Sequence, residues 1–242
     1  MENCHVAVFA AYCAEAGQAL VDVELYLPRA FAEDAERCRV AGVPAERAGT
    51  VVTKGELAAV MLTRAIEAGI RFGFVAGDEV YGRSPALRQA IEAAGRGYVL
   101  GVGVDRIVHR NSQDKTTAAA AKDELPAAAW QRKAAAAGAK GLREHAWAWI
   151  ALDPDGCPDG WTRSLRIRRD KDADAEHAYY LCYHRDTATL ADLVAVATRR
   201  WGTEEAFAIC KGEAGLDQHQ VRRWTPWYRH TILAMLAAAF LT

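Results

Sequence analysis

The sequence predicts an α/β protein in which an alternating strand–helix region is followed by a strand-rich segment and then by helices. Three observations support this prediction. Over residues 1–104, apolar segments of strand length alternate with segments of helical period. Residues 146–184 contain three more strand-like segments separated by turn sequences. Residues 190–241 have the apolar spacing of helices. This order favours a sheet covered by helices over an all-α or all-β fold.

The first hundred residues predict six elements. Residues 5–11 and 20–27 are rich in Val, Phe, Leu and Tyr, and the loop between them contains Gly17, which indicates a β-hairpin. Residues 28–50 form a connecting segment with a short helix. After it we expect a helix from Thr53 or Lys54 to Gly69, a strand over 72–76, a helix over 84–94 and a strand over 98–104. Ser84-Pro85 marks the start of the second helix, because Ser caps a helix and Pro suits its first turn.

The remaining chain divides into an insertion and a helical end. Residues 105–146 contain Ala runs and no regular apolar period, so they predict a long loop with local helix and a modestly basic surface, either a solvated linker or a DNA contact. Strands are expected over 146–152, 162–169 and 178–184, and helices over 190–211 and 227–241 with a break at 212–215. The predicted organisation is 1–104, first part of the core; 105–176, loop and β-rich insertion; and 177–242, last strand and helices.

The composition is that of an ordinary globular protein. Lys and Arg number 30 against 31 Asp and Glu, so the net charge of −1 gives no overall basic surface for nucleic acid. No apolar segment reaches ~18 residues, and the N-terminus lacks the basic leader of a secretory signal. Six Cys without a CxxC pair indicate reduced thiols and disfavour zinc. We therefore expect a cytoplasmic protein without membrane contact.

The first candidate for a chemically active group of residues is VAGDEVYG, residues 75–82. Asp78 follows a buried strand and a glycine, so its carboxylate would project from a rigid sheet. Two-metal phosphoryl-transfer sites need such fixed oxygen donors for Mg²⁺. The competing interpretation is that Asp78 or Glu79 caps the next helix. Spacing alone favours the cap.

The second constellation is RRWGTEEAFAICKGEAGLDQHQVRRW, residues 199–224. At about 100° per helical residue, Arg200, Glu204 and Lys211 fall within an arc of about 40°. A carboxylate between two cations suits a metal ligand whose neighbours hold phosphate. The alternative is an ordinary charged face with i,i+4 pairs. Helical phase favours Glu204 over Glu205 as the ligand.

Together and in this order, the two constellations resemble the catalytic domain of bacterial insertion-sequence transposases of the DDE type, in the group with a Tyr–Arg–Glu–Lys signature. In that pattern Arg stands four residues before the catalytic Glu and Lys seven after it, which matches Arg200, Glu204 and Lys211. GDEVYG with the following LRQAI and GYVLGV resembles the region of the second Asp, at Asp78. Further similar blocks are ELYLP (24–28), RCRVAGVP (37–44) and WYRHTILAMLAAAFL (227–241).

The resemblance implies an RNase H-like core with a β-rich insertion between the second Asp and the Glu. It implies that Asp78 and Glu204 are catalytic metal ligands for two Mg²⁺ or Mn²⁺ ions, and that Arg200, Lys211 and Trp201 contact DNA. In this family a water attacks a phosphodiester at a transposon end, and the freed 3′-hydroxyl then attacks target DNA. The implied partner is double-stranded DNA, with a homodimer or a mixed assembly with intact transposase, in the nucleoid-associated cytoplasm.

Two departures from the family pattern affect the expected activity. Ala197 occupies the position of the signature Tyr. The first catalytic Asp, expected on a strand ahead of the hairpin, has no counterpart, because the early acids are Glu2, Glu15, Asp22 and Glu24. We therefore expect an amino-terminally truncated core that lacks its first strand and has impaired strand cleavage. The alternatives are a non-catalytic DNA-binding or inhibitory remnant, and an unrelated RNase H-like nuclease that uses Asp22 as its third acid.

Overall fold

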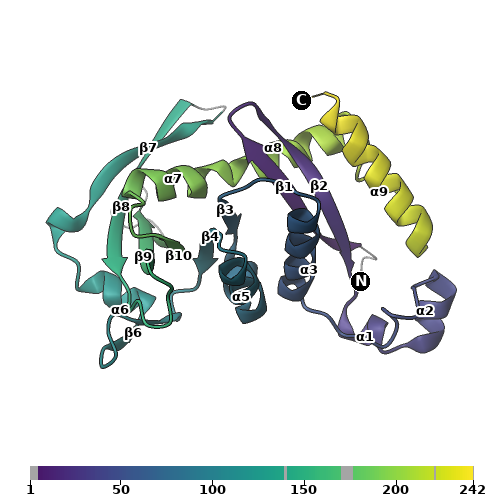
Figure 1. Ribbon diagram of the computed structural model, residues 1–242. Helices are drawn as coiled ribbons and strands as arrows, with labels where there is room; N and C mark the ends of the chain where they lie inside the picture. Colours follow the sequence, from purple (N-terminus) through teal and green to yellow (C-terminus); the bar gives the residue numbers. More distant parts are fainter. Residues whose placement is uncertain (1–4, 139–140, 170–176, 221, 242) are drawn as a thin grey trace. The chain divides into compact units, whose positions relative to one another are not determined.

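The computed structural model describes residues 5–138, 141–169, 177–220 and 222–241 (Figure 1). The chain forms two compact units. We call Met1–Ala65 with Arg200–Thr242 the hairpin unit, and Ile66–Arg199 the sheet unit. Both combine strands with helices, which confirms the predicted α/β class.

The hairpin unit is built on two antiparallel strands, β1 (Val6–Ala14) and β2 (Gly17–Tyr26), as predicted. The ladder shifts register between Ala10 and Ala11. The connecting segment contains two short helices, and three longer helices complete the unit: α1 (Arg29–Ala32), α2 (Ala35–Ala41), α3 (Lys54–Glu67), α8 (Trp201–Gly212) and α9 (Trp224–Ala239). A capping box starts α3, since the Thr53 N–H donates to Glu56 and the Glu56 N–H to Thr53 Oγ1.

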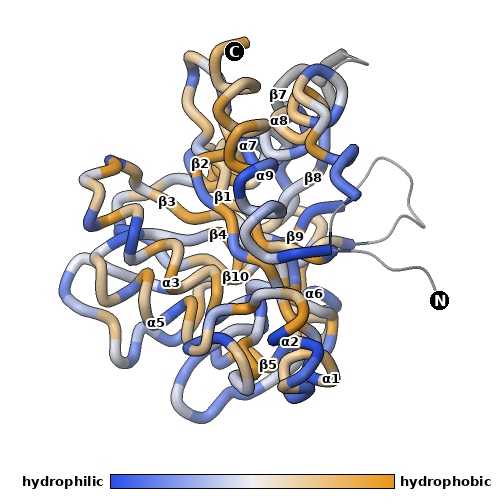
Figure 2. Tube along the Cα trace, turned by 90° about the vertical axis from the view of Figure 1, so that its right-hand side faces the viewer, coloured by the Kyte–Doolittle hydropathy of each residue, from blue (hydrophilic) through white to orange (hydrophobic). Residues whose placement is uncertain are grey.

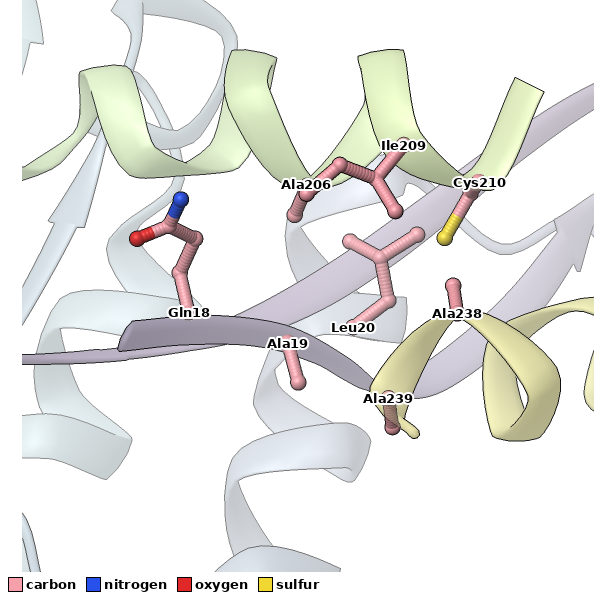
Figure 3. A pocket seen from close by; sticks show the side chains of 8 residues that line it. All are labelled: Gln18, Ala19, Leu20, Ala206, Ile209, Cys210, Ala238 and Ala239. Atoms are coloured by element: carbon pink, nitrogen blue, oxygen red, sulfur yellow. The ribbon is translucent and has the colours of Figure 1, made fainter. Parts of the chain in front are cut away.

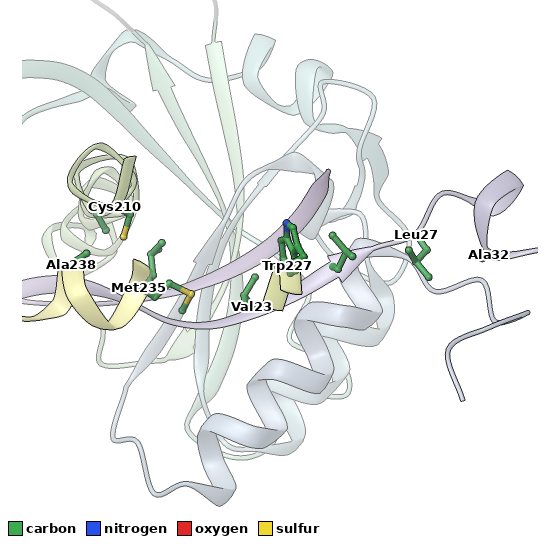
Figure 4. Packing of buried hydrophobic residues seen from close by; sticks show 10 residues of the cluster. Val23, Leu27, Ala32, Cys210, Trp227, Met235 and Ala238 are labelled. Carbon is green, nitrogen blue, oxygen red and sulfur yellow. The ribbon is translucent and has the colours of Figure 1, made fainter. Parts of the chain in front are cut away.

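The core of the hairpin unit lies between the hairpin and helices α8 and α9. It contains Leu20, Val23 and Leu25 from β2 together with Ala206, Cys210, Trp227, Met235 and Ala238 from the helices (Figure 4). A small pocket of about 10 Å³ remains between Leu20, Ala206 and Ala238 (Figure 3). This volume holds about one water molecule, whereas ligand pockets usually exceed ~300 Å³, so the gap is not a binding site.

The sheet unit contains one mixed six-stranded sheet in the order β3-β4-β10-β9-β8-β7. Only the β3–β4 pair is parallel. The strands are β3 (Phe74–Gly77), β4 (Gly97–Val102), β7 (Gln131–Gly138), β8 (Gly141–Ala151), β9 (Trp161–Arg169) and β10 (His177–Arg185). The helices are α4 (Glu79–Gly82), α5 (Pro85–Ala93), α6 (Ala118–Asp123) and α7 (Leu190–Arg199). All six residues of β4 are buried.

The structure differs from the prediction over residues 105–146. Where a long loop was expected, the chain forms a small ladder of β5 (Ile107–His109) with β6 (Lys115–Thr117), helix α6, a 3₁₀ turn at Ala127–Ala129, strand β7 and the start of β8. Alanine-rich β7 has neither the apolar alternation nor the β-branched residues by which strands are recognised. In addition, β10 pairs directly with β4, so the predicted insertion strands extend the sheet that contains β3.

Among the described residues, Cys13, Cys38, Cys157, Cys182 and Cys210 are free thiols, as predicted, and three of them are buried. Burial raises the pKa of the Cys182 thiol to about 12, so this cysteine is unreactive at neutral pH. None of the helices in the described part of the chain has both the length and the apolar character that a bilayer crossing requires.

Arg166, in the middle of β9, is an unusual core residue. It is 1% exposed, and its three guanidinium nitrogens have no hydrogen-bond partner among the described residues. Its Cζ lies 3.1 Å from the centroid of the Trp149 ring. Burial lowers the pKa of Arg166 to about 10. The cation–π contact stabilises the folded state by ~2 kcal/mol. This is less than the several kcal/mol that it costs to remove a cation from water.

We therefore expect Arg166→Met to raise the free energy of unfolding by about 1–2 kcal/mol, because Met keeps the packing on Trp149 and removes the buried charge. Urea unfolding at pH 7 measures the change. Arg185→Met is the control, because Arg185 is exposed and lies over the Trp161 ring, and it should shift stability by less than ~0.5 kcal/mol. A loss of stability in Arg166→Met would show that the guanidinium is compensated within the core, where Cys182 is its polar neighbour.

Candidate functional site

Asp78 stands at the carboxyl end of β3, at the N-cap of α4. Its Oδ1 accepts a hydrogen bond of 2.9 Å from the Val80 N–H, so the predicted capping role is present. The residue is exposed, and one cap bond occupies only part of a carboxylate's accepting capacity. Burial raises the pKa of Tyr81, and the nearby Asp78 carboxylate raises it further. The charge of Asp78 therefore acts on the next turn of the chain as well. A cap and a metal ligand are therefore compatible roles for Asp78.

Glycines hold the Asp78 segment against β4. A methyl group at Gly82 would overlap the carbonyl oxygen of Gly101. A Cβ at Gly101 would lie 3.0 Å from the Glu79 nitrogen and 3.1 Å from the Asp78 carbonyl carbon. Close backbone packing of this kind requires residues without side chains. The glycines of GDEVYG and GYVLGV thus fix the position of Asp78 at the end of the parallel strand pair.

Asp105 lies near Glu79, the residue after Asp78, and was not predicted from the sequence. Asp105 follows β4 as Asp78 follows β3, and adjacent parallel strands end at the same edge of a sheet. A Cβ at Gly103 would be 2.6 Å from Asp105 Oδ1 and 2.9 Å from Glu79 Oε1. Glu79 is already paired with Arg83. The signal that could have revealed Asp105 is its place after the second parallel strand.

Helix α8 separates its packing side from its charged side as the spacing predicts. Ala206 and Cys210 are buried against the hairpin and α9. On the opposite side, Arg200 Nη1 lies 3.9 Å from Glu204 Oε1, and the Glu204 side chain is 57% exposed. Lys211 is exposed, and its Nζ lies 5.6 Å from the centroid of the Phe207 ring. The solvent face of α8 therefore presents a carboxylate between two cations.

The structure distinguishes Glu204 from its neighbour Glu205. Gln18 Nε2 on the hairpin donates a 2.9 Å hydrogen bond to Glu205 Oε2. At Gly202, one turn earlier, a Cβ would be 3.1 Å from Cys13 Sγ, which shows how closely α8 approaches the hairpin on that side. Both glutamates are exposed, and Glu205 makes this bond to the hairpin. The choice of Glu204 as the ligand stays a prediction.

The tryptophans near this helix differ in environment. Trp201, at the first turn of α8, is 50% exposed. Trp227 is buried in the core of the hairpin unit, and Trp224 packs against the same core. Ala197, at the position of the signature Tyr, packs beside Val99, Cys182 and Leu193 in the sheet unit.

The acidic residues of β2 form an ion-pair network and are not available as ligands. Arg64 on α3 donates two 3.0 Å bonds to Asp22 and one of 2.6 Å to Glu24. The Tyr228 hydroxyl donates to Glu24 at 3.2 Å and accepts the Leu25 N–H at 3.0 Å. Asp22 therefore holds α3 to the hairpin, and this structural role argues against its use as a third catalytic acid.

The predicted site residues fall into both units. Arg200, Trp201, Glu204 and Lys211 share helix α8 of the hairpin unit, whereas Asp78 belongs to the sheet unit. Carboxylate oxygens are suitable donors for Mg²⁺ or Mn²⁺. No group of three His, Cys, Asp or Glu residues suited to a metal occurs among the described residues. Joint ligation of one ion by Asp78 and Glu204 thus stays a prediction.

The chain matches the model of a protein family. Residues 1–152 match the model of a family described as DDE superfamily endonuclease. This range covers more than half of the 242 residues and includes Asp78, whereas Glu204 lies beyond it. No curated protein gives a significant match.

Proposed function

The chain belongs to the DDE superfamily endonucleases, and from this premise we propose that it is a transposase-type nuclease of an insertion sequence, acting on the ends of mobile DNA. The observation that carries the proposal is the open face of α8, where Glu204 lies between Arg200 and Lys211 while Glu205 is bound to Gln18. DNA phosphate would bind along this face.

The proposed residues divide the chemistry between them. Arg200 and Lys211 donate hydrogen bonds to the non-bridging oxygens of the scissile phosphate, whose negative charge increases during attack. Trp201 packs beside the strand. Asp78 and Glu204 would hold Mg²⁺ or Mn²⁺, and a bound ion would offset charge on the attacking and leaving oxygens. Water forms a new P–O bond, the P–O3′ bond breaks, and the 3′-oxygen takes up a proton. The freed 3′-hydroxyl can then attack target DNA.

A second candidate is a non-catalytic DNA-binding remnant that inhibits an intact transposase by mixed assembly. It is favoured by the network around Arg64, because Asp22 and Glu24 are occupied by ion pairs and cannot complete a triad with Asp78 and Glu204. Two carboxylates would hold a pair of ions only weakly. On this ground we expect the chain by itself to cleave DNA slowly.

The metal site is tested by Mn²⁺ titration with electron paramagnetic resonance detection. Asp78→Asn keeps the helix cap, since Asn caps as well as Asp, and Glu204→Gln keeps the shape of the side chain. We expect each variant to bind Mn²⁺ about tenfold more weakly. The double variant should lose less than the product of the two effects, because both carboxylates would hold the same ion. Glu205→Gln is the matched control and should bind as the unmodified chain does.

Equal losses in Glu204→Gln and Glu205→Gln would contradict the assignment of the ligand. Independent effects of Asp78→Asn and Glu204→Gln would show that the two residues do not share an ion. Nicking of supercoiled DNA separates the two candidate functions. Mn²⁺-dependent nicks that disappear in both variants support the nuclease. DNA binding that weakens steeply with salt, without nicks in any variant, supports the remnant.

A further inference from the structure

Helix α4 is a single turn, and the position of Asp78 depends on it. The Tyr81 and Gly82 N–H groups donate to the Asp78 carbonyl oxygen at 3.2 and 3.0 Å. The Val80 N–H donates to the Asp78 carboxylate at 2.9 Å. Both the backbone and the side chain of Asp78 are therefore bound by α4. A helix of four residues is not stable by itself, because few hydrogen bonds offset the ordering of its backbone. Contacts from outside α4 must hold it in place.

Arg88 on α5 supplies one such contact at the far end of the turn. Its Nη1 donates a hydrogen bond to the carbonyl oxygen of Gly82, the last residue of α4. The last carbonyls of a helix have no partner within the helix, and an Arg side chain is a suitable donor to them. Helix α5 is itself well anchored, because it packs on β4 and buries Leu87 and Ile91. Hydrophobic and hydrophilic colours alternate along its trace (Figure 2). Two hydrogen bonds in sequence thus join α5 to Asp78 through Gly82.

The surroundings of Arg88 indicate that this bond is the reason for an Arg at the position. The side chain is half-buried, and within the described residues the Gly82 carbonyl is its only hydrogen-bond partner. Burial lowers the pKa of Arg88, and the charge of Arg106 lowers it further. An apolar side chain of similar length, such as Met, would fill the same space without a half-buried charge. What Met cannot supply is the hydrogen bond to Gly82.

We propose that Arg88 is a positioning residue for metal binding by Asp78, because it holds the turn of α4 that carries the carboxylate. This inference rests on the proposed function, in which Asp78 is a metal ligand. A carboxylate on a loosely held turn adopts orientations that do not fit an ion, so its affinity falls. Groups that orient a ligand without touching the metal typically change metal affinity by about 10- to 100-fold. Arg88 acts at the lower end of this range, since Gly82 also packs against Gly101.

Amide hydrogen exchange and Mn²⁺ binding test the two steps of the proposal separately. In Arg88→Met we expect the Gly82 amide to exchange at least about tenfold faster, because the turn opens more often. Mn²⁺, followed by electron paramagnetic resonance, should bind about tenfold more weakly. Arg88→Lys keeps a donor but loses the fixed guanidinium geometry, so both changes should shrink to about threefold. The matched control is Arg96→Met in the same unit. Arg96 is also half-buried, and it lies over the Phe72 ring, so this variant should change neither quantity.

The outcomes distinguish a failure of this proposal from a failure of the proposed function. If Asp78→Asn binds Mn²⁺ as the unmodified chain does, Asp78 is not a ligand and both are wrong. If Asp78→Asn weakens binding and Arg88→Met does not, only the positioning role is wrong. Equal losses in Arg88→Met and Arg96→Met would indicate a general loss of structure and would also overturn it. Should Arg88→Met fail to fold, Arg88→Lys decides: faster Gly82 exchange with weaker Mn²⁺ binding supports the proposal, and no change in either contradicts it.

Discussion

Gly82→Ala is expected to cost at least about 4 kcal/mol of unfolding free energy. The added methyl would overlap the Gly101 carbonyl oxygen, and the next atoms it meets are the Gly101 carbonyl carbon at 2.9 Å and Val102 Cγ1 at 3.2 Å. Two of these atoms are backbone atoms of a central, fully buried strand, so no flexible side chain can move aside. Helix α4 must instead lift from β4, which exposes apolar surface and breaks close packing.

The effect of Gly82→Ala can be separated from that of a generic glycine substitution. Gly73→Ala is the matched control in the same unit, because its Cβ would meet no atom within 4 Å and its backbone dihedral φ is not positive. It should be neutral or slightly stabilising. Urea unfolding followed by circular dichroism measures both variants. Equal stability of the two variants would mean that α4 does not pack on β4 as described, and the positioning of Asp78 would then need another explanation.

The hairpin, α5 and α9 illustrate what the sequence predicts well. Their apolar residues repeat with the period of the element, and Ser84-Pro85 marks the start of α5 by a local mechanism, since the Ser84 hydroxyl accepts the Leu87 N–H. The face formed by Arg200, Glu204 and Lys211 also follows from helical period alone. These features depend on residues a few positions apart, so a pattern in the sequence is sufficient to find them.

Features that depend on distant residues were not predicted. The pairing of β10 with β4 joins segments about 80 residues apart, and β7 shows no period because its alanines have little hydrophobic contrast. The bond between Glu205 and Gln18 joins residues that are 187 positions apart. Asp22 and Glu24 look like candidate ligands until Arg64 is placed beside them. Such contacts are decided by tertiary packing and not by local spacing.

Arg64→Ala is expected to lower the free energy of unfolding by about 1–2 kcal/mol, because Glu24 is largely buried whereas Arg64 itself is 42% exposed. The substitution removes the two bonds to Asp22 and the 2.6 Å bond to Glu24, and it leaves two adjacent carboxylates on β2. The Glu24 side chain is only 13% exposed, so water cannot replace the lost partner fully. Arg47, whose Nη1 lies 3.7 Å from Glu24, compensates in part. The Glu24 charge stays largely buried without its partner, which is costly, whereas the exposure of Arg64 limits the loss.

Arg39→Ala is the control that isolates burial from distance. Arg39 Nη2 lies 2.6 Å from Glu36 Oε1, the same separation as in the Arg64–Glu24 pair, but these side chains are 72% and 69% exposed. Exposed pairs contribute ~0.5 kcal/mol or less. Thermal and urea unfolding of both variants should therefore give losses that differ severalfold. Similar losses would indicate that β2 and α3 separate readily in solution. Asp22 and Glu24 would then be accessible to a metal ion, and the argument against a third acid in this chain would fail.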